Sequence, residues 1–241
     1  MSEENKAAEP ASADTPTPKP KRSKRKLATV IGVVAVVVVC AGAGFMVWHD
    51  QPSFCNAICH TPMDGYLKTY EATPGEAATD KWGNDVADAS SMLAPVHAQQ
   101  NITCVGCHVP TMSEQVSEGM SWVTGSYEVV QTTDERFVPE EKALSDLTAA
   151  RGVASEAFCL NSGCHTNADG SVMTRDDLVA KTSDMKRNPH VEEHGSVDCN
   201  ECHKAHRAST VNCSKCHSDA TIPDGWVSYK EAEALEPVAV S

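Results

Sequence analysis

The sequence predicts a mainly α-helical protein with extensive loops and little or no sheet, in which a single N-terminal transmembrane helix precedes the body. Two observations support this fold class. Residues 27–48 form an apolar run without a charged side chain. Aromatic residues make up only 5% of the 241 residues, which is too few for an ordinary side-chain core. We therefore expect short helices and loops rather than a layered domain.

Residues 1–26 predict a disordered basic tail. Residues 1–20 are rich in Ala, Glu, Pro, Thr and Ser, and they carry too little apolar surface to offset the entropy lost on ordering. The whole tail holds seven Lys/Arg against four Asp/Glu. Because basic residues flank the cytoplasmic end of a membrane span, the N-terminus is expected in the cytoplasm and the body on the extracytoplasmic (periplasmic) side of the cell membrane.

Residues 27–48 predict a single-pass anchor in the lipid bilayer. At about 1.5 Å per residue, such a helix reaches roughly 33 Å, enough to span the hydrocarbon core. Trp48 and His49 stand where an interfacial anchor belongs. A cleaved signal peptide is the alternative, because Ala41-Gly-Ala43 resembles a cleavage site. We favour the retained anchor, since the preceding tail is long for a signal peptide and the apolar run continues past Ala43.

The charge balance limits the classes of partner. Formal net charge is −13, and the acidic residues lie mostly in the body because the tail is basic. An acidic body argues against nucleic acid and favours docking on a basic protein surface. Acidity that serves only solubility is the competing interpretation.

Motifs of cysteine and histidine organise the body. Two thiols three positions apart can each form a thioether to one porphyrin, and the adjoining histidine then places its imidazole under the iron. Three motifs have this C-x-x-C-H form: Cys104-Val-Gly-Cys107-His108, Cys199-Asn-Glu-Cys202-His203 and Cys213-Ser-Lys-Cys216-His217. Two wider versions follow the same order: Cys55 and Cys59-His60, and Cys159 and Cys164-His165.

These five motifs predict five covalently attached haem c groups, and the body is thus expected to be a multihaem c-type cytochrome. They use ten of the eleven cysteines, and the eleventh, Cys40, lies in the apolar run. The flat apolar macrocycles can replace the missing core side chains. A zinc ribbon or a disulfide scaffold is the alternative. We favour haem, because histidine directly follows the second cysteine of every motif, which neither alternative requires.

Histidines account for most of the iron ligands. The motifs supply His60, His108, His165, His203 and His217, and five of the ten histidines remain. Bis-histidine coordination is therefore expected at most sites, with His97, His190 and His206 as the preferred second ligands. His194 is either a ligand or a loop histidine, and His49 at the membrane edge is the weakest candidate. Met63 is a rival ligand for the first haem.

The body divides into segments. We expect a dihaem region at 49–131, a connector at 132–157 with a short helix near 140–152, a trihaem region at 158–226, and a C-terminal tail at 227–241 that frays. Met112 to Gln131 reads as an amphipathic helix, and a polar helix is expected near Thr174 to Lys186. The apolar side of the amphipathic helix is expected to pack inside the protein; its residues are Met112, Val116, Met120, Val123 and Tyr127.

Roughly residues 21–130 resemble the NapC/NirT family of membrane-anchored, quinol-oxidising cytochromes. The matching features are the single anchor, Cys59-His60-Thr-Pro-Met63, His97, and Thr103-Cys-Val-Gly-Cys-His-Val-Pro110. The resemblance implies a first haem that is ligated by Met63 and lies at the membrane surface, where menaquinol or ubiquinol would be oxidised. The sequence departs from the family in the extra residue of its first motif and in Thr111, where the family often has Lys.

Residues 158–222 resemble the small tetrahaem domain of flavocytochrome c fumarate reductases. The matching runs are Asn188-Pro-His190, Val197-Asp-Cys-Asn-Glu-Cys-His-Lys-Ala-His206 and Asn212-Cys-Ser-Lys-Cys-His217. The resemblance implies that His190 and His206 are distal ligands, and we expect both to cap irons of the cluster Cys199 to His217. Such domains pass electrons to a flavin.

The leading hypothesis is an electron conduit from membrane quinol to a separate extracytoplasmic redox enzyme, either flavin-dependent and fumarate-reductase-like or nitrite-reductase-like. No catalytic residue is assigned, and enzymatic activity is not expected beyond quinol oxidation. A terminal reductase acting directly on a small oxyanion is the alternative, although it needs an iron with an open position. A haem-bearing sensor or assembly factor is a third hypothesis, disfavoured because five haems exceed what sensing needs.

Overall fold

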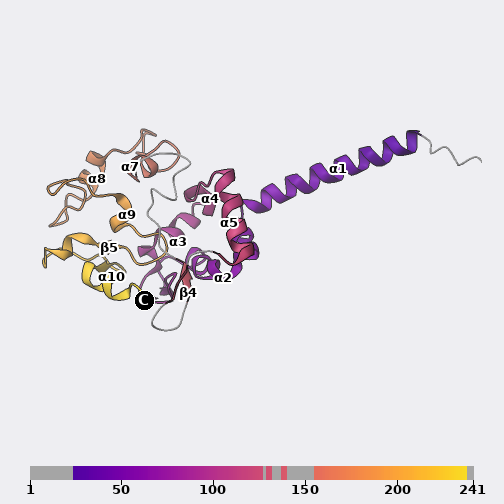
Figure 1. The fold of residues 1–241 in the computed structure, drawn as a ribbon. Helices are drawn as coiled ribbons and strands as arrows, with labels where there is room; N and C mark the ends of the chain where they lie inside the picture. The colour runs from indigo at the N-terminus through magenta and orange to yellow at the C-terminus, as the bar shows by residue number, and fades with distance from the viewer. Residues whose placement is uncertain (1–23, 127–128, 132–136, 140–154, 238–241) are drawn as a thin grey trace, which may run out of the picture. The chain divides into compact units, whose positions relative to one another are not determined.

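The computed structural model describes residues 24–126, 129–131, 137–139 and 155–237 (Figure 1). The chain forms two compact units, Met1–Met46 and Val47–Ser241. The first unit contains most of helix α1, Lys24–His49. The second contains all the cysteine and histidine motifs.

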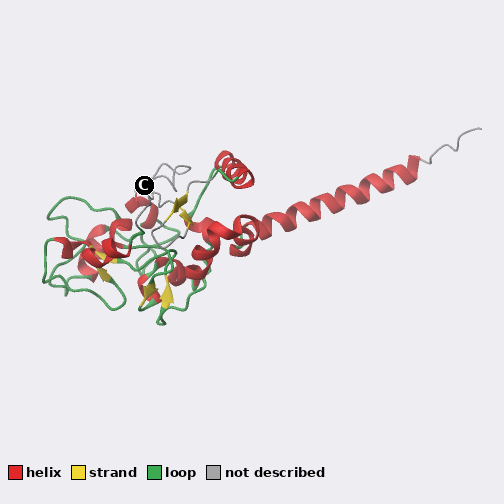
Figure 2. Cartoon of the chain, turned by 60° about the horizontal axis from the view of Figure 1, so that its bottom comes forward, coloured by secondary structure: helices red, strands yellow, loops and turns green. Residues whose placement is uncertain are grey.

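The second unit is built from short helices and long loops, as Figure 2 shows by the extent of the loop segments. Its helices are α2 Pro52–Tyr70, η1 Ala89–Ser91, α3 Leu93–Ala98, α4 Cys104–Cys107, α5 Met112–Thr124, α7 Ser155–Cys159, α8 Arg175–Lys181, α9 Cys199–Cys202, η2 Asn212–Lys215 and α10 Tyr229–Leu235. Its strands are β1 Ala78–Thr79, β2 Asp85–Val86, β3 Val129–Gln131, β4 Phe137–Pro139, β5 Thr210–Val211 and β6 Val227–Ser228. They form three two-stranded pairs, β1-β2 and β3-β4 antiparallel and β5-β6 parallel. The predicted fold class, mainly α with little sheet, is confirmed.

Helix α1 contains the predicted span and extends it slightly at both ends. Its apolar side chains are exposed along the described helix. Among the described residues, it is the one helix long and apolar enough to cross a membrane. A membrane anchor and a signal sequence both have this length and composition, so the helix is compatible with either.

Helix α2 leads into the body and packs closely on the loop after β1. Pro52 occupies a position in its first turn, where the missing N–H costs nothing. A Cβ atom on Gly65 would lie 2.5 Å from the carbonyl oxygen of Lys81, so only glycine permits this approach. The loop itself is held by Asp80, whose Oδ1 accepts hydrogen bonds from the backbone N–H groups of Trp82 and Asn84, each at 2.8 Å.

A small apolar core joins the early and late parts of the second unit. Val86, Ala89 and Met92 pack with Ala208, and all four are buried. Segment 204–209 is tied to residues 81–94 by four backbone hydrogen bonds: Lys81 N to His206 O (2.9 Å), Leu93 N to Lys204 O (2.9 Å), Ala94 N to Ala205 O (2.9 Å) and Ser209 N to Ser91 O (3.1 Å). We call these four hydrogen bonds the ladder of segment 204–209. They place His206 beside α2, where it contacts Thr69.

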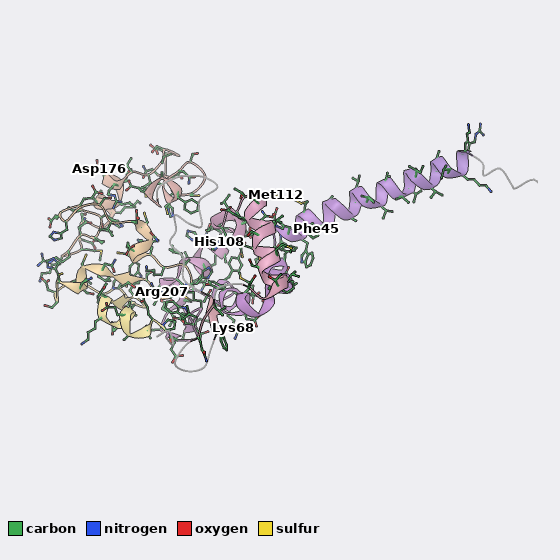
Figure 3. All side chains as sticks on the ribbon, in the orientation of Figure 1. Phe45, Lys68, His108, Met112, Asp176 and Arg207 are labelled. Carbon is green, nitrogen blue, oxygen red and sulfur yellow. The ribbon has the colours of Figure 1, made fainter. Side chains whose placement is uncertain are left out.

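Helix α5 departs from the sequence prediction in length and in packing. It begins with a capping box between Thr111 and Glu114 and ends at Gly125, whose φ of 68° stops the helix in the left-handed region. The prediction that its apolar side packs inside is wrong for the described residues, because these side chains are mostly exposed: Met112 74%, Val116 63%, Met120 57% and Val123 69%. Gln115 and Trp122, which lie outside this apolar stripe, are partly buried. Figure 3 shows Met112 at the start of this helix; Tyr127 lies outside the described residues.

The C-terminal segment also differs from the prediction. Residues 227–235 do not fray: β6 pairs with β5, and α10 follows with a capping box between Ser228 and Glu231. Helix α8 is shorter than the helix expected near Thr174 to Lys186, because it ends at Lys181 and a turn follows from Thr182. The helix expected near 140–152 lies outside the described residues, as does most of the connector 132–157.

Candidate functional site

Each C-x-x-C-H motif forms a single helical turn with the same internal hydrogen bond. In this turn the histidine N–H donates to the carbonyl of the first cysteine, which sets both thiols on one side and the imidazole next to them. The donor to acceptor distances are His108 to Cys104, 2.8 Å, His203 to Cys199, 2.9 Å, and His217 to Cys213, 2.8 Å.

The widened third motif reaches the same arrangement through an extra turn. The N–H of His165 again bonds to the carbonyl of the first cysteine, Cys159, at 3.3 Å. Asn161 folds the intervening residues, since its Nδ2 donates to Phe158 O at 2.7 Å and its Oδ1 accepts from Gly163 N at 2.9 Å. The extra residues are therefore looped out, and the cysteine to histidine relationship of the ordinary motif is kept.

The first motif lies within the continuous helix α2. Residues four apart share a face of an α-helix as residues three apart do, so the extra residue between Cys55 and Cys59 still leaves both on one side. Met63 follows on the same helix and is partly buried. The side chains of Cys59 and His60 lie outside the described part of the chain, so their predicted roles stay predictions.

Four motif histidines each face a second histidine. The ring-centroid distances and interplanar angles are His108 and His206, 6.3 Å and 26°; His165 and His97, 6.1 Å and 75°; His203 and His190, 6.4 Å and 10°; His217 and His194, 6.1 Å and 19°. The expectation that His206 caps an iron of the C-terminal cluster is wrong in this geometry, since its ring faces His108. His194, left open between ligand and loop, lies opposite His217.

The separation of the paired rings matches the space that one iron needs. A first-row metal holds an imidazole nitrogen at about 2 Å, and the ring centroid lies about 1.1 Å farther out, so two opposed ligands have centroids roughly 6.2 Å apart. All four observed distances lie within 6.1 to 6.4 Å. With thiols beside each pair, the described residues therefore fit covalently bound haem.

Burial favours the neutral, ligating form of these imidazoles. Burial lowers the pKa of His206 to about 3, with smaller contributions from His108 and Lys81. Burial likewise lowers the pKa of His108, and Lys81 adds to the effect. The pKa values of His97, His190 and His203 are also lowered, in each case mainly by burial. A neutral imidazole keeps one nitrogen lone pair available for a metal.

Thiols from different motifs lie in contact. A hydrogen bond between Cys55 and Cys104 raises the pKa of Cys55 and lowers that of Cys104 to about 7. A similar hydrogen bond to Cys199 raises the pKa of Cys159. The first and second motifs therefore adjoin one another, and so do the third and fourth.

The start of the second unit brings His49 close to the first motif. Its ring lies 4.9 Å from that of Phe54, which directly precedes Cys55. His49 Nδ1 also lies 3.3 Å from Asp50 Oδ1. Both candidates for the second ligand of the first haem, His49 and Met63, thus remain near this motif.

The described residues do not support a zinc site. Among them, no three side chains of His, Cys, Asp or Glu converge on a point where one metal ion would bind. The zinc-ribbon alternative therefore lacks a four-ligand cluster among the described residues.

The motifs and facing histidines together define a c-type cytochrome, a protein that binds haem covalently and transfers electrons. The chain is 54% identical over 210 residues to the cytochrome c-type protein Cgr1 of Eggerthella lenta, an alignment that covers 87% of this chain and 91% of the relative. The chain belongs to the family of that cytochrome. No protein-family model matches the chain, and no solved structure matches it.

Sequence reasoning named the histidines but missed the residues that hold them. Thr69, on α2, bonds to His206, and Thr182, at the end of α8, bonds to His190. No motif marks either threonine. The sequence placed His190 in the C-terminal cluster, where its ring faces His203, but it did not predict the other three pairings, because these depend on how distant segments pack.

Proposed function

We propose that this chain is a membrane-anchored pentahaem c-type cytochrome that transfers electrons from the membrane quinol pool to an extracytoplasmic reductase. The observation that carries the proposal is the set of four facing histidine pairs. A metal held between two such imidazoles has no open position for a substrate. The geometry therefore favours electron transfer over direct reduction of a small oxyanion.

The chain's own residues would hold and orient each cofactor. The ten motif cysteines would form the thioethers, and the four histidine pairs would hold the irons at the second to fifth motifs. At the first motif, His60 would be joined by Met63 or His49. When bound, haem c supplies a one-electron couple at each iron.

Contacts between motifs support a continuous electron path. The Cys55 and Cys104 thiols touch, as do those of Cys159 and Cys199, so cofactors attached there would be neighbours. His97 comes from the early part of the chain and faces His165 in the third motif. This pairing would connect the first two attachment sites with the last three.

Electron entry is assigned to the first motif. It begins six residues after His49, the last residue of α1, and a membrane-anchored chain would hold it at the extracytoplasmic surface. The resemblance to NapC/NirT cytochromes supports menaquinol or ubiquinol as the donor. Each quinol would release two electrons to the chain and two protons to the extracytoplasmic side.

Electron exit is assigned to the last motif, around Cys213 and Cys216. The acidic composition of the chain, with net charge −13, suits a partner with a basic docking surface. The resemblance to flavocytochrome c domains supports a flavin-dependent, fumarate-reductase-like partner, with a haem nitrite reductase as the other candidate.

Two paired variants of the full-length protein test this direction. In a bilayer nanodisc, Cys55→Ser/Cys59→Ser is expected to abolish haem reduction by menaquinol while dithionite still reduces the remaining haems. Cys213→Ser/Cys216→Ser is expected to keep reduction by menaquinol and to lose electron delivery to the partner enzyme. Haem absorbance measures both. Equal reduction of the two variants by menaquinol would contradict entry at the first motif.

Spectroscopy of the unaltered protein tests the class of function. Five haems by intact mass and uniformly low-spin iron by electron paramagnetic resonance are expected. A stoichiometric high-spin iron that binds nitrite would instead favour the terminal reductase.

A further inference from the structure

A buried threonine hydroxyl contacts one of the paired histidines. Thr69 has an exposed fraction of 0%, and its Oγ1 lies 2.6 Å from His206 Nδ1 and 2.7 Å from the carbonyl oxygen of Tyr66. Thr69 and His206 are separated by 137 positions in the sequence. The contact therefore depends on the ladder that ties segment 204–209 to residues 81–94.

Counting protons fixes the direction of both hydrogen bonds. A hydroxyl has one proton to donate, and a carbonyl can only accept. The Thr69 hydroxyl therefore donates to Tyr66 O, and one of its lone pairs accepts from His206 Nδ1–H. Because a neutral imidazole carries a single N–H, the Nε2 atom of His206 is left without a proton.

A similar contact joins Thr182 to His190, the histidine that faces His203. Thr182 Oγ1 lies 2.8 Å from both Leu178 O and Asn188 Oδ1, and 3.0 Å from His190 Nδ1. Both oxygens are acceptors, since Asn188 Oδ1 also receives the backbone N–H of His190 at 3.1 Å. The hydroxyl proton of Thr182 is thus engaged, and its oxygen accepts from the His190 ring. The carbonyl of Leu178 accepts from the same ring, so here the acceptor is shared.

We propose that Thr69 is a positioning residue that fixes the tautomer of His206 so that Nε2 is presented to the iron, and that Thr182 does the same for His190. The proposal rests on the bis-histidine ligation proposed above. An acceptor on the far nitrogen orients a ligating imidazole and raises its basicity. A more basic ligand stabilises the oxidised iron, so each threonine lowers the reduction potential of its haem.

A purely local role is the competing explanation. Threonine in a helix commonly bonds to the carbonyl three or four residues earlier, as Thr69 does to Tyr66 and Thr182 to Leu178. Thr124 on α5 makes the same kind of bond, to Met120 O at 2.9 Å, and its hydroxyl otherwise contacts only Ser121 O and Ser126 Oγ among the described residues. It is therefore the matched control for the local role.

The test uses the full-length holoprotein and its redox titration. Thr69→Val keeps the shape of the side chain and removes the acceptor, and it is expected to raise one midpoint potential while haem content and the low-spin spectrum persist. Thr69→Ser is expected to restore the original potential. Thr182→Val is expected to raise a different midpoint potential by less, because Leu178 O still accepts. Thr124→Val is expected to leave every potential unchanged.

The outcomes separate the threonine role from the ligation itself. If the original protein lacks bis-histidine signals in its paramagnetic resonance spectrum, both proposals fail. If these signals are present and Thr69→Val shifts no potential, the positioning role alone is overturned. Should Thr69→Val not fold, proton NMR of the original oxidised protein decides: a hyperfine-shifted imidazole N–H that exchanges slowly supports the proposal, and rapid exchange of all such protons overturns it.

Discussion

The rings of His108 and His206 face each other at 6.3 Å, although one follows the second motif and the other follows the fourth. His206 reaches this place because segment 204–209 is hydrogen-bonded to residues 81–94. In the proposed ligation, the second haem therefore depends on both the early and the late part of the chain. A cofactor at this site would connect segments that the sequence divides into two regions.

Replacing His206 by alanine tests this pair. The haem proposed at Cys104 and Cys107 is expected to lose one of its two histidine ligands and to become high-spin, because no other described histidine faces His108. Electron paramagnetic resonance of the oxidised protein measures the change. Tyr66→Phe is the control, since the ring that lies 4.9 Å from His206 is retained. An unchanged low-spin spectrum in His206→Ala would contradict the assignment.

Asn161→Ala tests how the widened third motif is held. The variant loses the two hydrogen bonds that fold the extra residues, each worth about 1 kcal/mol. Cys159 and Cys164 are then expected to be presented less well for attachment, so a fraction of molecules should carry one haem fewer by intact mass. Asn167→Ala, in the following loop, serves as the control. Equal haem content in both variants would show that the turn is dispensable.

Gly65→Ala tests the close approach between α2 and the loop at Lys81. The added Cβ would lie 2.5 Å from a backbone oxygen, so the helix or the loop must shift at a cost of about 1–3 kcal/mol. Gly119→Ala is the matched change on α5, where nothing lies within 4 Å, and it is expected to stabilise by about 0.5–1 kcal/mol. Thermal unfolding compares the two. A stable Gly65→Ala protein would contradict the close packing.

A pair of apolar substitutions tests where the core lies. Met92→Ala is expected to destabilise by about 2–5 kcal/mol, because Met92 is fully buried. Val123→Ser is expected to change stability by no more than about 0.5 kcal/mol, since this side chain is 69% exposed. Denaturant unfolding of the holoprotein measures both. A large loss in Val123→Ser would mean that the apolar side of α5 is covered after all.

The motif residues were accessible to sequence reasoning because their chemistry is local. Cys104, Cys107 and His108 lie within one helical turn, so spacing alone predicts how they are presented. The same holds for the apolar span. His97, His190 and His206 were predicted as ligands from the histidine count, and the structure places each ring opposite a motif histidine; their ligation stays a prediction.

The pairing of the histidines and the packing of helix α5 could not be predicted from the sequence in the same way. Whether His206 faces His108 or a nearer histidine is decided by hydrogen bonds between segments far apart in the sequence. Periodicity showed that α5 is amphipathic, but the pattern does not say whether another segment covers its apolar side. The helix α10 was missed although its capping box, Ser228 and Glu231, is a readable signal.

The ladder of segment 204–209 also implies an order in which the site between His108 and His206 is assembled during export. If the body is exported from its anchored end onward, as its synthesis order favours, Cys104 and Cys107 reach the extracytoplasmic side before His206 does. His108 would thus be in place before its partner His206, which follows the fourth motif. His206 could face His108 only after the chain has been exported at least as far as Ser209, because the ladder ends there. The late segment therefore completes a site that the early segment begins.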